Sequence, residues 1–173
     1  MIIDASMIFD QNVPVTVSRV STNSIDLQGI LITSGSQYGG ALQGRDLNGG
    51  DGIQVPKMFA LVMTTFTGGT SLNVQFQGAP DNGSGSPGTY NTFAETGAIP
   101  VASLIAGFRV FEIDLPGPIS NFPLPRFVQL NYVTVGTFTT GALYSAVVLS
   151  RDEIPQGPGA LWSGHRPGFA VAN

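Results

Sequence analysis

The chain of 173 residues contains no cysteine, one histidine and few charged residues. The absence of cysteine excludes disulfides and thiol chemistry, and a single histidine then excludes Cys/His zinc sites, which need at least three such ligands. Asp, Glu, Lys and Arg make up only 10% of the residues, against about 25% in ordinary globular domains. The surface is therefore built largely from neutral polar groups, which lose little hydration when a partner covers them.

Basic residues are equally scarce. The seven Lys and Arg side chains are scattered and the net charge is −4, so we expect no nucleic-acid partner. The longest apolar runs are about eight residues, short of a membrane span, and the amino terminus lacks the basic and apolar regions of a signal peptide. We therefore expect no membrane partner. We also expect no cofactor.

Several segments show the period of two that is typical of β-strands. In the clearest one, the apolar residues Leu72, Val74 and Phe76 alternate with polar neighbours. Residues 58–66 are almost continuously apolar, which predicts a strand covered on both faces. Further strands are expected at residues 13–20, 24–28, 108–115, 126–135 and 143–150, with a hairpin between the last two.

These short strands, separated by Gly and Pro, predict an all-β, jelly-roll-like β-sandwich over residues 1–153. We expect no amphipathic helix of ten or more residues, a short helical turn at residues 101–106, and either a short helical turn or an extended arm at residues 1–12. Residues 33–55 form a long Gly-rich loop without periodicity, a kind of segment that often serves binding or assembly. Residues 154–173 are rich in Pro and Gly and hold the only Trp and His, which predicts an extended C-terminal arm.

The chain offers two candidates for acid–base catalysis. Glu112 and Asp114 are two residues apart on a predicted strand and point to one face, as a glycosidase carboxylate pair could. The same pattern, with Phe111 and Ile113 facing inward, more simply marks the solvated face of a strand. His165 lies in the arm and lacks the rigid scaffold of a Ser-His-Asp triad. We expect no enzymatic activity.

Two glycine-rich stretches resemble ligand-binding loops. Residues 83–88 match G-x-G-x-x-G, but phosphate binding needs a helix after the glycines. Pro87 and a strand-like segment after it predict a turn instead. Residues 46–52 resemble a calcium loop, yet its twelfth position is Lys57 rather than the Glu of an EF-hand. We expect no metal, with an irregular calcium site as the alternative.

Two regions are similar to phage proteins. The opening residues 1–4 (MIID) with Phe9, followed by residues 21–27 (STNSIDL), resemble the start of tailed-phage capsid cement proteins of the Bordetella podophage type. Residues 126–132 (RFVQLNY) and 136–141 (GTFTTG) resemble the last hairpin of that family. The similarity spans most of residues 1–151, whereas residues 155–173 depart from the family pattern.

The resemblance implies a jelly-roll protein on the outer surface of the virion. Such a protein binds the major capsid protein, stiffens the shell against DNA pressure and forms a homo-oligomer, either a dimer or a trimer. We predict contacts with these partners from apolar and arm residues: Ile2, Ile3, Phe9, Tyr38, Leu161, Trp162, His165, Arg166 and Phe169. Trp is enriched among interface hot spots.

Two alternatives stay open at this stage. The arm could order on a partner or fold back on its own sandwich. The chain could also be a carbohydrate- or receptor-binding jelly-roll module of a phage particle. That function would require a platform of exposed aromatic side chains, for which Tyr38, Tyr90 and Trp162 are the obvious candidates.

Overall fold

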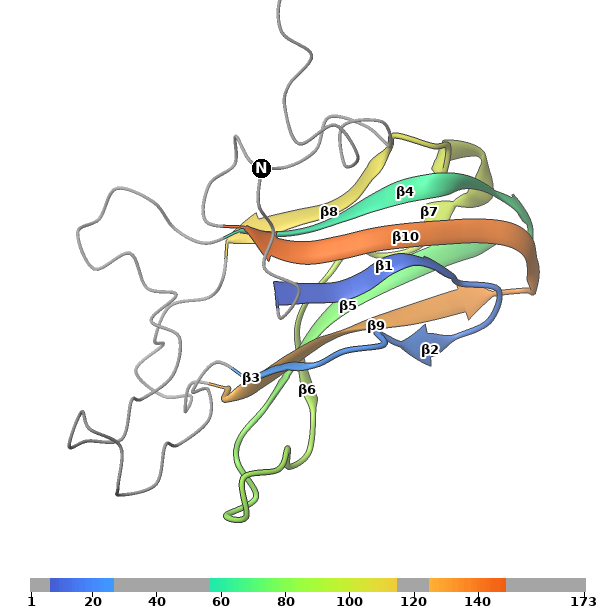
Figure 1. The fold of residues 1–173 in the computed structure, drawn as a ribbon. Helices are drawn as coiled ribbons and strands as arrows, with labels where there is room; N and C mark the ends of the chain where they lie inside the picture. The colour runs from blue at the N-terminus through green and yellow to red at the C-terminus, as the bar shows by residue number, and fades with distance from the viewer. Residues whose placement is uncertain (1–6, 27–56, 115–124, 149–173) are drawn as a thin grey trace, which may run out of the picture.

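The chain folds into two antiparallel β-sheets that pack face to face (Figure 1). The computed structural model describes residues 7–26, 57–114 and 125–148. Sheet A consists, in spatial order, of β1 (Ile8–Pro14), β10 (Phe138–Val148), β4 (Lys57–Gly68) and β8 (Arg109–Asp114). Sheet B consists of β2 (Arg19–Val20), β9 (Phe127–Val135), β5 (Ser71–Ala79) and β6 (Asn91–Glu95), while β3 (Ile25–Asp26) also pairs with β9 and β7 (Ile99–Pro100) with β5. The prediction of an all-β sandwich is confirmed.

Most of the predicted strands lie where the apolar pattern placed them. The residue ranges 58–66, 72–77, 109–114, 127–135 and 143–148 are all in strands. The short helical turn expected at residues 101–106 is the 3-10 helix η2, which covers only Val101–Ser103. Local periodicity therefore predicted these elements well.

The predicted strand at residues 13–20 is wrong, because the chain changes sheets within it. β1 ends at Pro14, which has no N–H for a sheet ladder. The N–H of Val15 donates to the carbonyl of Gly141 at 3.0 Å, and Val17 is 54% exposed. Strand pairing then resumes in sheet B at Arg19. The alternation of Val13, Val15 and Val17 predicted one continuous strand and gave no sign of this bend.

The predicted hairpin between the last two strands is also wrong. β9 pairs with β5 in sheet B, whereas β10 pairs with β1 and β4 in sheet A. The connection at Gly136 therefore crosses from one sheet to the other, as does the connection from β4 to β5 at Gly69. Both glycines have positive φ, and a Cβ on Gly136 would lie 3.1 Å from the Cα of Gly69. Glycine at position 136 allows the two crossings to lie against each other.

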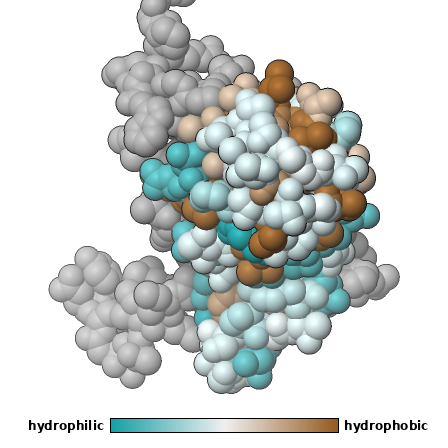
Figure 2. Space-filling view, turned by 90° about the vertical axis from the view of Figure 1, so that its right-hand side faces the viewer, coloured by the Kyte–Doolittle hydropathy of each residue, from teal (hydrophilic) through white to brown (hydrophobic). Residues whose placement is uncertain are grey.

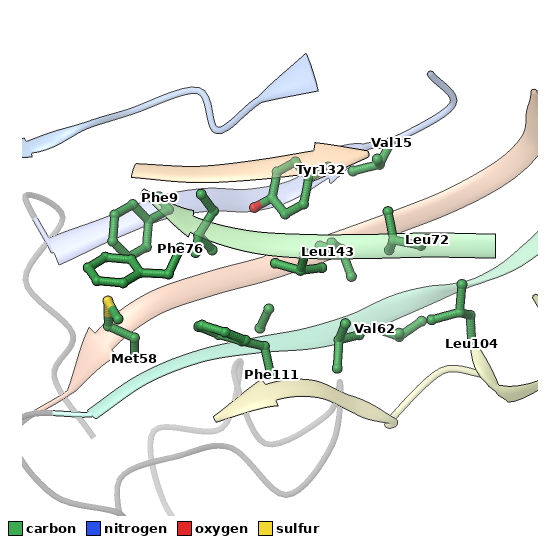
Figure 3. Packing of buried hydrophobic residues seen from close by; sticks show 14 of the residues in the cluster. Phe9, Val15, Met58, Val62, Leu72, Phe76, Leu104, Phe111, Tyr132 and Leu143 are labelled. Atoms are coloured by element: carbon green, nitrogen blue, oxygen red, sulfur yellow. The ribbon is translucent and has the colours of Figure 1, made fainter. Parts of the chain in front are cut away.

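The core fills the space between the sheets (Figure 3). Apolar side chains from both sheets contribute to it, among them Val62, Leu72, Phe76, Tyr132 and Leu143. Phe9 is fully buried in the same cluster, so the prediction that it contacts a partner is wrong. Its face of β1 points inward.

The segments outside the described residues are 1–6, 27–56, 115–124 and 149–173. The described strands that adjoin them all end at the same end of the sandwich, which we call the open end. In sheet A, Ile8 lies opposite Ala146, and Lys57 lies opposite Val148. The opposite end, where the sheet-to-sheet crossings occur, is called the turn end. The predicted Gly-rich loop and C-terminal arm lie outside the described residues.

Candidate interaction surfaces

The outer face of sheet B carries a row of side-chain amides. We call Asn73, Gln75 and Gln77 of β5, with Gln129 and Asn131 of β9, the amide ladder. Gln129 donates to Gln77 at 2.9 Å, and Asn131 donates to Gln75 at 2.8 Å. The residues of each pair are direct cross-strand partners, the arrangement in which neighbouring side chains on a sheet interact.

The ladder continues onto β6. Glu95 accepts hydrogen bonds from Asn73 at 2.9 Å and from Gln75 at 3.1 Å. Gln77 donates to Thr92 at 3.3 Å. The bonds from Asn73 and Gln75 to the carboxylate lower the pKa of Glu95 below its usual value. Glu95 is thus an ionised group held by two neutral amides.

The outer face of sheet A is apolar instead. On β4, Phe59 and Leu61 alternate with core residues and point away from the core. They belong to a second cluster, which we call the outer cluster: Phe59, Leu61, Tyr144, Ala146 and Val148, with Ile8 and Met63 at its margin. Residues 58–66 were predicted to be covered on both faces. This is confirmed for residues 58–62, which are all fully buried, and wrong for Thr64 and Thr65, which are exposed.

Aromatic packing contributes to the outer cluster. The rings of Phe59 and Tyr144 lie 5.8 Å apart, centroid to centroid, a distance typical of favourable ring pairs. Burial raises the pKa of the Tyr144 hydroxyl above its usual value.

Two ion pairs border the outer cluster along β8. Arg109 donates to Glu112 at 2.9 Å, and Lys57 pairs with Asp114. Phe111 belongs to the core, so the inward and outward faces of this strand are as predicted. Both carboxylates of the candidate catalytic pair are therefore bound to basic side chains.

A buried carboxylate joins the two sheets. Asp10 is 1% exposed and accepts hydrogen bonds from Arg19, Thr22 and Tyr132. The register of β1 shifts between Ile8 and Asp10, and this bulge turns Asp10 inward. Burial and the Asp10 charge raise the pKa of Tyr132 well above its usual value. An acidic residue within an apolar strand was the sequence signal for this network, and our reading of the sequence missed it.

The glycine-rich segment at residues 83–88 is a turn, as predicted. Its backbone N–H groups at Gly83 and Gly85 donate to Asp81 at 2.7 and 3.0 Å. These bonds, above all the one from Gly85, lower the pKa of Asp81. The segment thus binds its own carboxylate with the N–H groups that a phosphate loop would offer a ligand.

The turn end carries separate exposed apolar side chains. Val17, Ile105 and Val135 are each more than half exposed. Figure 2 looks onto this end and shows pale, weakly polar atoms over much of the surface, with isolated brown patches between them. This view agrees with the low charge content of the sequence.

Eight of the predicted contact residues lie outside the described residues: Ile2, Ile3, Tyr38, Leu161, Trp162, His165, Arg166 and Phe169. Tyr90 is partly buried. Its burial raises the pKa of the hydroxyl, and a hydrogen bond with Ser24 lowers it by a smaller amount.

In the described ranges, no three His, Cys, Asp or Glu side chains gather as metal ligands would. No helix within these ranges is long and apolar enough to cross a membrane.

No protein-family model matches the chain, and no curated protein matches it.

Proposed function

We propose that this chain is a non-enzymatic capsid cement protein. It binds the outer surface of a major capsid protein shell, as a dimer or trimer, and stiffens that shell. The amide ladder is the observation that carries the proposal. The amides of this surface are paired with one another across the strands, and two of them hold the neighbouring carboxylate of Glu95.

Such a face suits adhesion to protein. Covering it removes few charges from water, so the desolvation cost is low. Its amides retain acceptor and donor positions for a partner backbone. In a shell, each weak contact becomes effectively intramolecular once neighbouring copies are held in place, and overall binding strengthens without new contacts.

The strand order supports a jelly roll as the architecture for this role. In chain order, β1, β4, β8 and β10 form one sheet, and the strands between them form the other. Double-sheet jelly rolls of eight strands include viral capsid and lectin domains. The partner shell itself is proposed from the resemblance of residues 1–4, 21–27 and 126–141 to cement proteins.

The proposal is tested on particles assembled with and without this chain. We expect extra density outside the shell when the chain is present, and a higher temperature of DNA release. Particles that show neither difference would overturn the proposed function.

A pair of variants locates the contact face. Asn131→Lys places an unpaired charge in the middle of the ladder, and burying such a charge costs several kcal/mol. We expect shell binding to weaken at least about tenfold, which corresponds to 1.4 kcal/mol. Thr89→Lys adds the same charge at an exposed site outside the ladder and should bind normally. Equal binding by both variants would exclude the ladder as the contact face.

The carbohydrate-binding alternative draws on the same ladder, because amides also pair with sugar hydroxyls. A glycan array separates the two functions. Specific glycan binding that Asn131→Lys abolishes, together with no binding to the shell, would favour this second candidate.

A further inference from the structure

The outer cluster of sheet A is buried, although no described element lies over it. Phe59, Leu61 and Ala146 are fully buried, although they point away from the core. Among the described elements, the strands β10 and β8 lie beside β4 in the same sheet, and none packs on its outer face. Leaving a Phe or Leu side chain in water costs about 1.5–3 kcal/mol relative to burial. A covering segment is therefore strongly favoured.

We propose that residues 149–173 of the same chain dock on the outer cluster. The attachment point favours this segment, because it begins directly after Val148, which is itself a member of the cluster. The cluster extends from Val148 to Met63 along two central strands, about 20 Å at the rise of a β-strand. Residues 149–173 reach about 80 Å when extended, so they can turn and run back along it.

The chemistry of the segment matches the face. It carries Leu161, Trp162 and Phe169 among prolines and glycines. Proline and glycine disfavour a regular element of its own, so these large side chains need an apolar surface elsewhere. The ion pairs of β8 border the cluster on one side, which leaves the apolar middle for the aromatic groups.

Other segments of the chain fit less well. Residues 27–56 and 115–124 are fixed at both ends and connect the two sheets at the open end. Residues 1–6 reach only about 20 Å when extended, which leaves no length for turning back over the sheet, and they contain no aromatic residue. A tethered segment also has an effective concentration of about millimolar, so its own copy outcompetes that of a second molecule in dilute solution.

Cysteine cross-linking tests the docking in the full chain. Because the natural sequence has no cysteine, only introduced thiols react. Met63→Cys is combined with Leu161→Cys, Trp162→Cys or Phe169→Cys, and a short bifunctional thiol reagent is added. We expect at least one pair to give a monomeric cross-linked product with a severalfold higher yield than the matched control. In the control, Val20→Cys on the outer face of sheet B replaces Met63→Cys.

Each other result overturns the proposal. Equal yields from Met63→Cys and Val20→Cys would show that the arm does not prefer the outer cluster. A product that runs as a dimer would show that a second copy supplies the segment. Efficient cross-linking of Met63→Cys to Ile3→Cys, without cross-linking to the arm, would identify residues 1–6 as the cover.

The single tryptophan gives an independent readout. Trp162 is the only Trp in the chain, so acrylamide quenching of fluorescence reports on the arm alone. Met63→Glu places a charge at the margin of the cluster, and we expect quenching to increase severalfold. Val20→Glu should leave it unchanged. Identical quenching in the two variants, with circular dichroism confirming that both are folded, contradicts docking. Neither experiment needs a capsid, so docking can fail while the proposed function holds, and the reverse.

Discussion

The hydroxyl of Tyr132 in sheet B donates a 2.7 Å hydrogen bond to the carboxylate of Asp10 in sheet A. The bond lies inside the sandwich and connects an edge strand of one sheet to a central strand of the other. Ser145 approaches the same hydroxyl at 3.0 Å. Arg19 and Thr22 bind the other oxygen of Asp10. The carboxylate therefore fixes how the amino-terminal strand is placed over the core.

Removing the hydroxyl should destabilise the fold. Tyr132→Phe leaves one buried oxygen of Asp10 without its donor, and a buried polar group without a partner costs about 1–3 kcal/mol. We expect the urea midpoint to fall accordingly with an unchanged slope. Tyr144→Phe is the matched control, because its hydroxyl forms no hydrogen bond within the described residues. Equal losses in the two variants would contradict the role given to the bond.

The stability should fall at alkaline pH. Burial and Asp10 raise the pKa of Tyr132 above the 10.0 of a free tyrosine. The unfolded chain therefore releases this proton first as the pH rises. The unfolded state then binds fewer protons, so the contribution of Tyr132 to the unfolding free energy is constant below about pH 10 and falls above it. The slope is about 1.4 kcal/mol per pH unit for each such tyrosine.

Denaturant titrations from pH 8 to 11 measure this effect. Tyr132→Phe removes the group and should show a shallower decline than the natural chain. A decline of the same steepness in both proteins would show that other groups cause it.

A glycine on β10 should tolerate no side chain. A Cβ at Gly141 would lie 2.2 Å from the ring of Phe66, and φ at this residue is +141°. The ring packs edge-on against Phe138 at 5.0 Å, so it has little freedom to move. We expect Gly141→Ala to destabilise the protein by about 3 kcal/mol or more, since overpacking alone costs about 1–3 kcal/mol.

Gly83→Ala is the control for backbone strain. Gly83 also has positive φ, at +91°, but nothing lies within 4 Å of a Cβ there. We expect a loss of about 1 kcal/mol, the order of the strain of an L-residue in this region. Thermal unfolding of both variants compares them, and similar losses would contradict the clash with Phe66.

Deleting residues 155–173 should uncover the outer cluster. The truncated protein then exposes Phe59 and Leu61, and burial of each of these side chains contributes about 1.5–3 kcal/mol to stability. We expect a lower melting temperature, increased binding of a hydrophobic dye and concentration-dependent association, measured by sedimentation. A truncated protein that stays monomeric, binds no dye and melts normally would contradict the proposed cover.

The sequence alone determined the local features of this protein. The alternation at Leu72, Val74 and Phe76 encodes a strand with one buried face, because side chains alternate along any strand. The apolar run beginning at Met58 likewise encoded burial on both faces. The low charge content, which follows from composition, already favoured a surface that partners can cover.

Only the tertiary structure decided which strands pair and which groups meet. The turn at Gly136 suits a hairpin as well as a sheet crossing, and the choice depends on distant strands that offer matching partners, such as Gln77 for Gln129. A one-residue bulge turned Asp10 inward, and a bulge shifts every side chain that follows it to the other face. Phe9 was expected at a partner interface and lies in the core, because it faces the opposite sheet while its neighbour Ile8 faces outward. Burial is set by contacts between residues far apart in the sequence, and local pattern does not contain them.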